Sequence, residues 1–483
     1  MKNLRKILAS LLLVALVFGL TACRKKENEP AKKDYSGVEL TYYKVFDDEE
    51  VLAPAIQQYE ADHPGLKIHY KKFSDFNEYQ NQILNEMAEG EGPDIFSMQN
   101  TWFASNYRKI APMPATLGGP DDFAKVFVDT AYKDLVRPDA NGDEQVYGVP
   151  MTVDTLALYY NKAQFEDRIP TRGQPSSTWE GIKDDVVQLT KTNSSFSRFE
   201  VSGIAMGRAD NISRGVDILY LLFLQYGVKF YNDNISEATF AGQYGTASTA
   251  TYPALDALNF YKSFADPKQK NYTWNEYSAD DDTQKEVDAF ASGKVSMMAG
   301  FSYTYDDIVN QISVLSSRGV QTIDKNDIRI APIPQIYDPE ISKDKRVTYA
   351  NYFAETVSKN SKNPDLAWDF LIYMTNKKNL EHYYDELHKP TSRRDMIEDQ
   401  SKDPIFGVFA SQIGYAESFP ILDYYWYKDI FAAVINQANT AQVTNGDLLN
   451  AQNLITEKLP KDGLINEKKK SEAVEPPPDD GEN

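Results

Sequence analysis

Two kinds of hydrophobic spacing alternate along the chain and limit the folds open to it. Apolar residues alternate with polar ones over residues 38–42, recur at helical spacing over 51–59, and alternate again over 66–70. A strand, a helix and a second strand in this order form the unit from which parallel sheets are built. Further strands and helices follow. The sequence therefore predicts an α/β fold, and 483 residues favour two sheets over one.

The composition excludes several classes of protein. The chain has 51 Lys and Arg residues against 71 Asp and Glu, and this net charge of −20 argues against nucleic-acid binding. One cysteine allows neither an intrachain disulfide nor a thiolate cluster, and the four histidines lack metal-ligand spacing. Phosphate-binding and hydrolase-elbow motifs are missing. We therefore predict no metal, no cofactor and no bound nucleic acid.

The N-terminus has the features of an export signal. Three basic residues precede an apolar stretch, residues 7–20, which is shorter than the roughly 20 residues that span a bilayer. The stretch ends in Leu-Thr-Ala-Cys, which resembles the bacterial lipobox. This resemblance implies a lipoprotein signal peptide over residues 1–22 and an acyl anchor, such as palmitate, on Cys23. The alternative is an ordinary secretory signal with an incidental cysteine.

Both ends of the mature chain are polar and lack an apolar period. We predict that residues 23–37 form a flexible tether and that residues 466–483 form a disordered acidic tail. With two acyl chains on Cys23, the protein would be attached stably to the cell membrane at its extracytoplasmic face.

Seven segments resemble, in order, the family 1 extracellular solute-binding proteins of ABC importers, which include maltose- and multiple-sugar-binding proteins. They cover most of the mature chain. The segments are YYKVFDDEEVLAPAIQQYEADHPGLKIHY (42–70), EGEGPDIF (89–96), YGVPMTVDTLALYYNK (147–162), STWEGI (177–182), FASGKVSMMAGFSY (290–303), VSKNSKNPDLAWDFL (357–371) and PTSRRD (390–395).

The resemblance implies a periplasmic-binding-protein-like fold of class II, in which two α/β lobes are joined by a hinge. Lobe one would be residues 38–149 plus 336–380, and lobe two residues 150–335 plus 381–465. The hinge would include Met151, Thr152 and Val153. A monomeric protein of this kind captures a carbohydrate, here an oligosaccharide, and delivers it unaltered to the permease subunits, so we predict that it is no enzyme.

Sugar recognition needs aromatic faces for the C–H side of the ring and polar groups for its hydroxyls. Loops after the carboxyl ends of strands present such groups in α/β proteins. Residues that fit this rule and the family pattern are Asp47, Asp48, Gln99, Asn100, Trp102, Asp154, Tyr303 and Tyr305. The resemblance also implies Trp426 and Tyr427, which lie where the family often has an aromatic platform, and Arg393 of the segment PTSRRD.

Each of these assignments has a structural alternative. Asp47 and Asp48 fit the start of the next helix, where negative charge is favoured. Trp102 and Trp426 fit a core equally well, and Arg393 fits a surface salt bridge.

Three other functions stay open. The same clamp would suit a polyol, a phosphorylated glycerol or a polyamine, the last because Asp47, Asp48 and Asp154 would make an acidic pocket. A surface glycoside hydrolase would need two carboxylates about 5–10 Å apart, and the sequence has many acidic residues. A lipoprotein adhesin would bind polymers without closing on small sugars.

Overall fold

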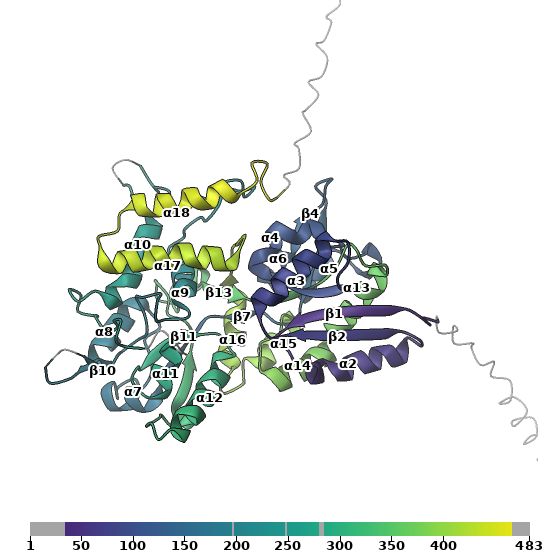
Figure 1. Ribbon diagram of the computed structural model, residues 1–483. Coiled ribbons are helices and arrows are strands. Elements are labelled where there is room, and N and C mark those ends of the chain that lie inside the picture. The colour runs from purple at the N-terminus through teal and green to yellow at the C-terminus, as the bar shows by residue number, and fades with distance from the viewer. Residues whose placement is uncertain (1–33, 196–197, 247–248, 280–284, 466–483) are drawn as a thin grey trace, which may run out of the picture.

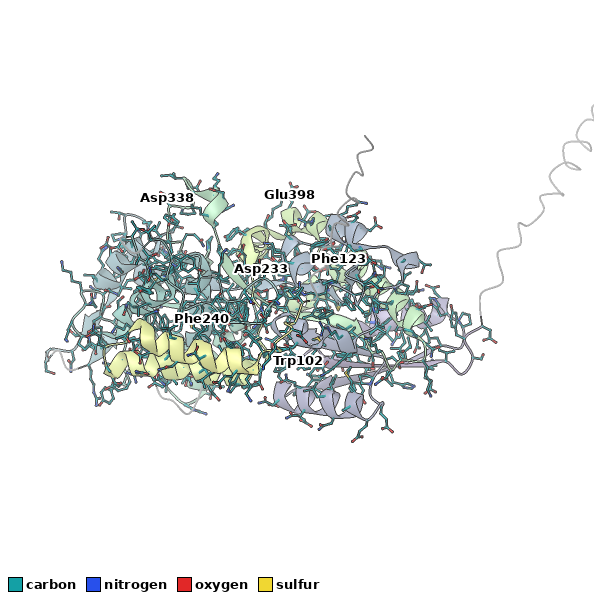
Figure 2. All side chains as sticks on the ribbon, turned by 90° about the horizontal axis from the view of Figure 1, so that it is seen from above. Trp102, Phe123, Asp233, Phe240, Asp338 and Glu398 are labelled. Carbon is teal, nitrogen blue, oxygen red and sulfur yellow. The ribbon has the colours of Figure 1, made fainter. Side chains whose placement is uncertain are left out.

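The computed structural model describes residues 34–195, 198–246, 249–279 and 285–465. The predicted signal peptide, Cys23, residues 23–33 of the predicted tether and the predicted tail lie outside these residues. The described residues form two bodies that lie side by side (Figure 1). Each has its own hydrophobic core: Phe123 is buried in the first and Phe240 in the second (Figure 2). We call these bodies the first and the second lobe.

The first lobe is built on a five-stranded sheet. Its order is β2(Lys67–Phe73), β1(Glu39–Val45), β3(Ile95–Gln99), β14(Phe353–Val357) and β6(Val149–Pro150). β1 is parallel to β2 and to β3, whereas β14 is antiparallel to β3 and to β6. The helix between β1 and β2, α2(Glu49–Asp62), buries Leu52, Ala55, Ile56 and Tyr59. This spacing of three or four residues places them on one face, and the predicted strand–helix–strand unit is confirmed.

Further helices and a hairpin complete the first lobe. They are α3(Phe76–Ala88), α4(Phe103–Asn106), α5(Pro120–Val126), α6(Asp129–Leu135), α13(Pro364–Met374), α14(Lys377–Leu387) and α15(Arg394–Gln400), the hairpin β4(Val136–Pro138)–β5(Glu144–Val146), and the 3₁₀ turns η1(Asn100–Trp102), η2(Tyr107–Lys109) and η3(Ala115–Leu117).

The second lobe contains a three-stranded sheet and a hairpin, and a further three-stranded sheet lies where the chain passes between the two cores. In the first sheet, β8(Ala157–Asn161) lies between β11(Met297–Gly300) and β12(Ile328–Ala331) and is antiparallel to both. In the second, β13(Thr348–Asn351) lies between β15(Ala416–Glu417) and β7(Asp154–Thr155). The hairpin pairs β9(Lys191–Thr192) with β10(Phe199–Val201).

Helices surround these sheets. α9(Gly215–Gln225) is apolar on almost every side and therefore runs through the core. The others are α7(Lys162–Arg168), α8(Trp179–Leu189), α10(Pro253–Lys262), α11(Lys285–Ala291), α12(Thr304–Ser317), α16(Gly407–Gln412), α17(Tyr424–Thr440) and α18(Asn445–Lys458), with the 3₁₀ turns η4(Ser263–Ala265), η5(Lys325–Asp327) and η6(Lys343–Lys345). The turn η7(Ile413–Tyr415) buries Ile413 in the core of the first lobe. No helix of the described segments is long and apolar enough to cross a membrane.

The chain passes from one core to the other at residues 153–156, 349–350 and 396–406, and beyond these crossings Ile413 and Ala416 pack in the first core before Phe419 packs in the second. Tyr383 and Met396, which we expected in the second lobe, pack in the core of the first. Tyr383 is held in the first lobe by a hydrogen bond that its hydroxyl donates to Asp47, which follows β1. Residues 381–397 therefore lie with the first lobe.

Candidate functional site

A cavity of about 490 Å³, which we call the cleft, is lined by residues of both lobes. Clefts of this size between two bodies are the usual sites for small molecules. The lining residues are Lys44, Val45, Phe46, Asp47, Phe76, Gln99, Met151, Thr152, Asp154, Arg214, Phe301, Tyr303, Asp307, Asn351, Tyr352, Phe353, Tyr383, Lys389, Tyr424 and Tyr425.

The carboxyl ends of three strands supply part of this lining. Phe46 and Asp47 follow β1, Gln99 ends β3, and Tyr303 follows β11. In α/β proteins this edge of a sheet is where ligands bind, because loops rather than helices begin there. The sheets of the two lobes thus present their loops to one cavity.

Aromatic rings from both lobes meet in the cleft. The ring centroids of Phe76 and Phe353 lie 5.6 Å apart, and Tyr425 of the second lobe lies 6.4 Å from Phe76. Phe46 lies 6.1 Å from Phe353, is 49% exposed, and has a φ of 73°. A bulky residue in the left-handed region is strained by about 1–3 kcal/mol, and such strain is found chiefly at functional sites. These rings give the cleft a partly exposed aromatic surface.

Paired charges form a second part of the lining. Asp47 lies 2.7 Å from Nζ of Lys389 and 3.3 Å from Nζ of Lys44, which also pairs with Glu355. Burial opposes ionisation of Asp47, but the two lysines outweigh it and lower its pKa to about 2. Asp47 is therefore charged and already neutralised by protein groups.

Asp154 is buried where the chain enters the second lobe. It accepts hydrogen bonds from the amide of Ser302 at 3.0 Å, from the hydroxyl of Ser302 at 2.6 Å, and from the amide of Thr155 at 2.8 Å. Burial nevertheless raises the pKa of Asp154 to about 6. Its hydrogen bonds join the beginning of β7 to the segment after β11.

The raised pKa of Asp154 predicts that the stability of the fold depends on pH. The pKa is higher in the folded state than the roughly 3.9 of an unfolded chain, so the stabilisation is complete below about pH 4 and is lost as the pH rises through about 6. We expect Asp154→Asn to remove this dependence, which amounts to about 3 kcal/mol between pH 4 and pH 7. Guanidinium unfolding of both proteins across this range measures it, and parallel stability curves would contradict the prediction.

Arg214 and Asp307 provide a donor and an acceptor on the side of the second lobe. Nη1 of Arg214 lies 3.1 Å from the buried carboxylate of Asp217, and its guanidinium lies 5.8 Å from the ring centroid of Tyr303. Asp307 also lines the cleft, its pKa is raised by burial, and its carboxylate has no hydrogen-bond partner among the residues that the structure describes. Both groups are thus placed to contact a solute.

Four predicted ligand-binding residues lie together in the cleft: Asp47, Gln99, Asp154 and Tyr303. Met151 and Thr152 of the predicted hinge line it as well, whereas Val153 is buried in the first core.

Three predicted residues of the first lobe lie outside the cleft. Asp48 is at the N-terminus of α2, where it pairs with Lys72, as the alternative assignment proposed. Asn100 is buried and donates to Asp134 at 3.1 Å. Trp102 is buried in the first core.

The remaining predicted residues also lie outside the cleft. Tyr305 packs against Phe406, with ring centroids 5.2 Å apart, and Arg393 pairs with Asp395 at 2.9 Å. Trp426 packs against the second core. Tyr427 is fully buried there, and its hydroxyl lies 2.8 Å from that of Tyr231. The first turn of α17 instead presents Tyr424 and Tyr425 to the cleft.

Sequence reasoning missed several lining residues. Tyr424 and Tyr425 directly precede the predicted pair Trp426 and Tyr427, so the right segment was found but not the right face of its helix. Arg214 and Phe353 carried no signal of their own.

No cluster of three or more His, Cys, Asp or Glu side chains suited to a metal ion occurs in the described segments.

Residues 54–407 match the family model of bacterial extracellular solute-binding proteins. The chain belongs to this family. Membership confirms the predicted family and places the protein outside the cytoplasm. It also confirms that the chain is a binding protein and not an enzyme.

Individual relatives agree with this assignment. A binding protein of Brucella abortus (strain 2308) is 23% identical over 319 residues, which cover 66% of this chain and 67% of the relative. The galactooligosaccharide-binding protein of Bacillus subtilis (strain 168) is 26% identical over 164 residues, 34% of this chain and 36% of the relative.

Solved structures show the same fold. The sugar-binding protein MalE from Xanthomonas citri superimposes with a TM-score of 0.66 at 16% identity, over 87% of this chain and 97% of that protein. The predicted two-lobed α/β fold is therefore confirmed.

Proposed function

We propose that this solute-binding protein serves an ABC importer and holds a carbohydrate, an oligosaccharide, in the cleft without altering it. The observation that carries the proposal is the lining of the cleft. The partly exposed rings of Phe46 and Tyr425 suit the C–H faces of sugar rings. Beside them, Gln99, Arg214 and Asp307 offer hydrogen-bonding groups for hydroxyls.

Gln99 has a hydrogen-bond acceptor that such a hydroxyl could use. Its Nε2 donates to Asn351 at 2.9 Å, but its buried Oε1 has no partner among the described residues. A buried acceptor without a donor is costly, by about 1–3 kcal/mol. A hydroxyl of the solute would satisfy it.

The charged groups of the cleft are mostly paired with other charged groups of the protein, which favours an uncharged solute. Lys44, Lys389 and Arg214 each pair with a carboxylate of the protein, so free cations for a phosphate are not available from these groups. Asp47 is neutralised by lysines, and the carboxylate of Asp154 accepts three hydrogen bonds from the protein. Among the carboxylates that line the cleft in the described residues, Asp307 alone has no hydrogen-bond partner, so the acidic pocket that a polyamine would need is largely occupied.

The two separate hydrophobic cores support a protein whose lobes close on the solute like a clamp. We propose that residues 151–153, together with 349–353 and 397–406, form the hinge, and that the lobes close on the solute. Closure follows if the closed state has the higher affinity, and the permease then recognises that state. The core membership of residues around these segments supports lobe one as 38–153 plus 350–397, and lobe two as 156–349 plus 406–465, although Ile413 and Ala416 pack in the first core and Ala104 packs in the second.

We also propose that the protein is a monomer attached to the cell membrane through acyl chains on Cys23. The lipobox-like segment supports this. We expect Cys23→Ser to move the protein from the detergent phase to the aqueous phase in Triton X-114 partition of whole cells, because its only lipidation site is lost. The wild-type protein, labelled with palmitate, is the control. An unlabelled wild-type protein in the aqueous phase would contradict the anchor.

A thermal-shift screen tests the choice of solute. A ligand that binds only the folded state stabilises it by RT ln(1 + [L]/Kd), about 2.7 kcal/mol at a hundredfold excess over Kd. We expect an oligosaccharide to raise the Tm by several degrees, and spermidine, glycerol phosphate and polyols to leave it unchanged. A rise with one of these three, and with none of the sugars, would contradict a carbohydrate cargo.

A further inference from the structure

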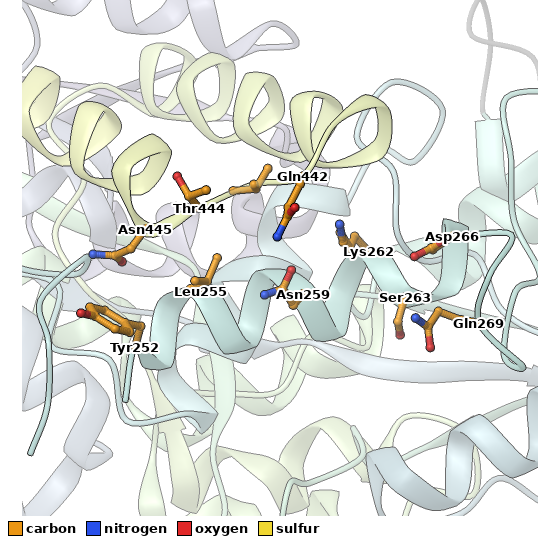
Figure 3. Close-up of a pocket in the computed structure, with 11 residues that line it drawn as sticks. Tyr252, Leu255, Asn259, Lys262, Ser263, Asp266, Gln269, Gln442, Thr444 and Asn445 are labelled. Carbon is orange, nitrogen blue, oxygen red and sulfur yellow. The ribbon is translucent and has the colours of Figure 1, made fainter. Parts of the chain in front are cut away.

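A second hollow lies on the second lobe, away from the cleft. It has a volume of about 660 Å³ and lies between α10 and the loop that joins α17 to α18 (Figure 3). We call it the α10 groove. α17 carries Tyr425 in its first turn and has 17 residues, so its far end, beside the groove, is roughly 25 Å from the cleft.

One wall of the groove is a stripe along α10. Leu255, Asn259 and Lys262 are spaced three or four residues apart and therefore share one face of the helix, and the N-cap residue Tyr252 continues this stripe. This stripe is roughly 15 Å long at the rise of an α-helix. It is long enough for an extended ligand.

The opposite wall is the loop over residues 441–444. In Figure 3, Gln442 points from this loop toward α10, with Asn259 facing it. Val443, which also lines the groove, is buried in the second core, so the wall is fixed by packing.

Several amide groups of the groove are unused. Within the described residues, the side-chain amides of Asn259 and Gln442 have no hydrogen-bond partner. Asn445 donates from Nδ2 to the carbonyl of Ala241 at 3.0 Å, but its buried Oδ1 has no partner among the same residues. Donors and acceptors for hydroxyl groups therefore line both walls.

The groove carries no net charge although the whole chain carries −20. Lys262 and Asp266 are its charged lining residues and balance each other. Tyr252 and Leu255 add apolar surface to the amides. Apolar faces beside neutral amides match a polyhydroxylated chain without charge.

We infer that the α10 groove binds a neutral polysaccharide. The ligand class follows from the groove's own chemistry and extends the proposed function, since it is a second site outside the cleft. A polymer held there stays near the cleft, so oligosaccharides that a separate glycoside hydrolase releases from it by hydrolysis have a raised local concentration at the cleft.

Native electrophoresis through gels that contain amylopectin, galactan or mannan tests the inference. The groove variant combines Asn259→Ala with Gln442→Ala; both side chains are exposed, so the fold should be retained. A matched control combines Gln188→Ala with Asn436→Ala, an exposed Gln and an exposed Asn of the same lobe that do not line the groove. The variant Tyr425→Ala tests independence from the cleft.

We expect one of the three polymers to retard the wild-type protein, the matched control and Tyr425→Ala equally. The groove variant should bind it about tenfold more weakly, because two hydrogen bonds are lost. No retardation by any polymer, or equal retardation of the groove variant, would overturn the inference. Loss of retardation in Tyr425→Ala would assign the polymer to the cleft and overturn it too. Failure of the proposed function would appear separately, as a thermal-shift screen in which no sugar raises the Tm.

Discussion

We expect Lys44→Met to lower the free energy of unfolding by about 3–5 kcal/mol, the cost of breaking a buried ion pair by removing one partner. Lys44 is 3% exposed and lies between the carboxylates of Glu355 and Asp47. Methionine keeps the length of the side chain but leaves Glu355, itself 1% exposed, without a countercharge. Urea unfolding followed by circular dichroism measures the loss.

Lys72→Met is the matched control. Lys72 also pairs with an aspartate, Asp48, but the carboxylate is 64% exposed. Exposed pairs contribute about 0–1 kcal/mol, so this variant should be nearly as stable as the wild type. Adding Glu355→Gln to Lys44→Met should recover part of the loss, because the uncompensated charge is removed. Equal stability of Lys44→Met and Lys72→Met would contradict the ion-pair account.

The second large effect concerns solute binding. We expect Tyr425→Ala to raise the Kd for the oligosaccharide by about 10- to 100-fold, as for the loss of an aromatic binding hot spot. Tyr425 is 36% exposed in the cleft and faces Phe76 of the other lobe, so its removal takes away a contact surface without opening a core. Isothermal titration calorimetry with the sugar found by thermal shift measures the change.

Tyr337→Ala is the matched control for this variant. Tyr337 is 52% exposed and is not part of the cleft lining. Its replacement should leave the Kd unchanged. If both tyrosine variants bound the sugar as tightly as the wild type, the aromatic surface of the cleft would have no role in binding.

Much of the first lobe could be predicted from the sequence because its signals are local. Apolar alternation and helical spacing over residues 38–70 correspond to β1, α2 and β2. The rule that ligands bind after the carboxyl ends of strands led to Asp47, Gln99 and Tyr303, all of which line the cleft. These inferences need only residues that are close in sequence.

The rest of the site depends on contacts between distant segments. β14 is inserted antiparallel beside β3, and Glu355 accepts a hydrogen bond from Ser97 across 258 positions of the chain. No local pattern predicts that this strand brings Phe353 to the cleft. Likewise, packing against the second core decides that α17 buries Tyr427 and exposes Tyr425.

Hydrogen–deuterium exchange with and without the oligosaccharide reports both whether the sugar binds and where it binds. We expect protection in peptides that contain Phe46 and Phe353 of the first lobe and, at the same time, Tyr303 and Tyr425 of the second. Protection limited to one lobe, or no protection by any carbohydrate that the protein is offered at saturating concentration, would contradict this expectation.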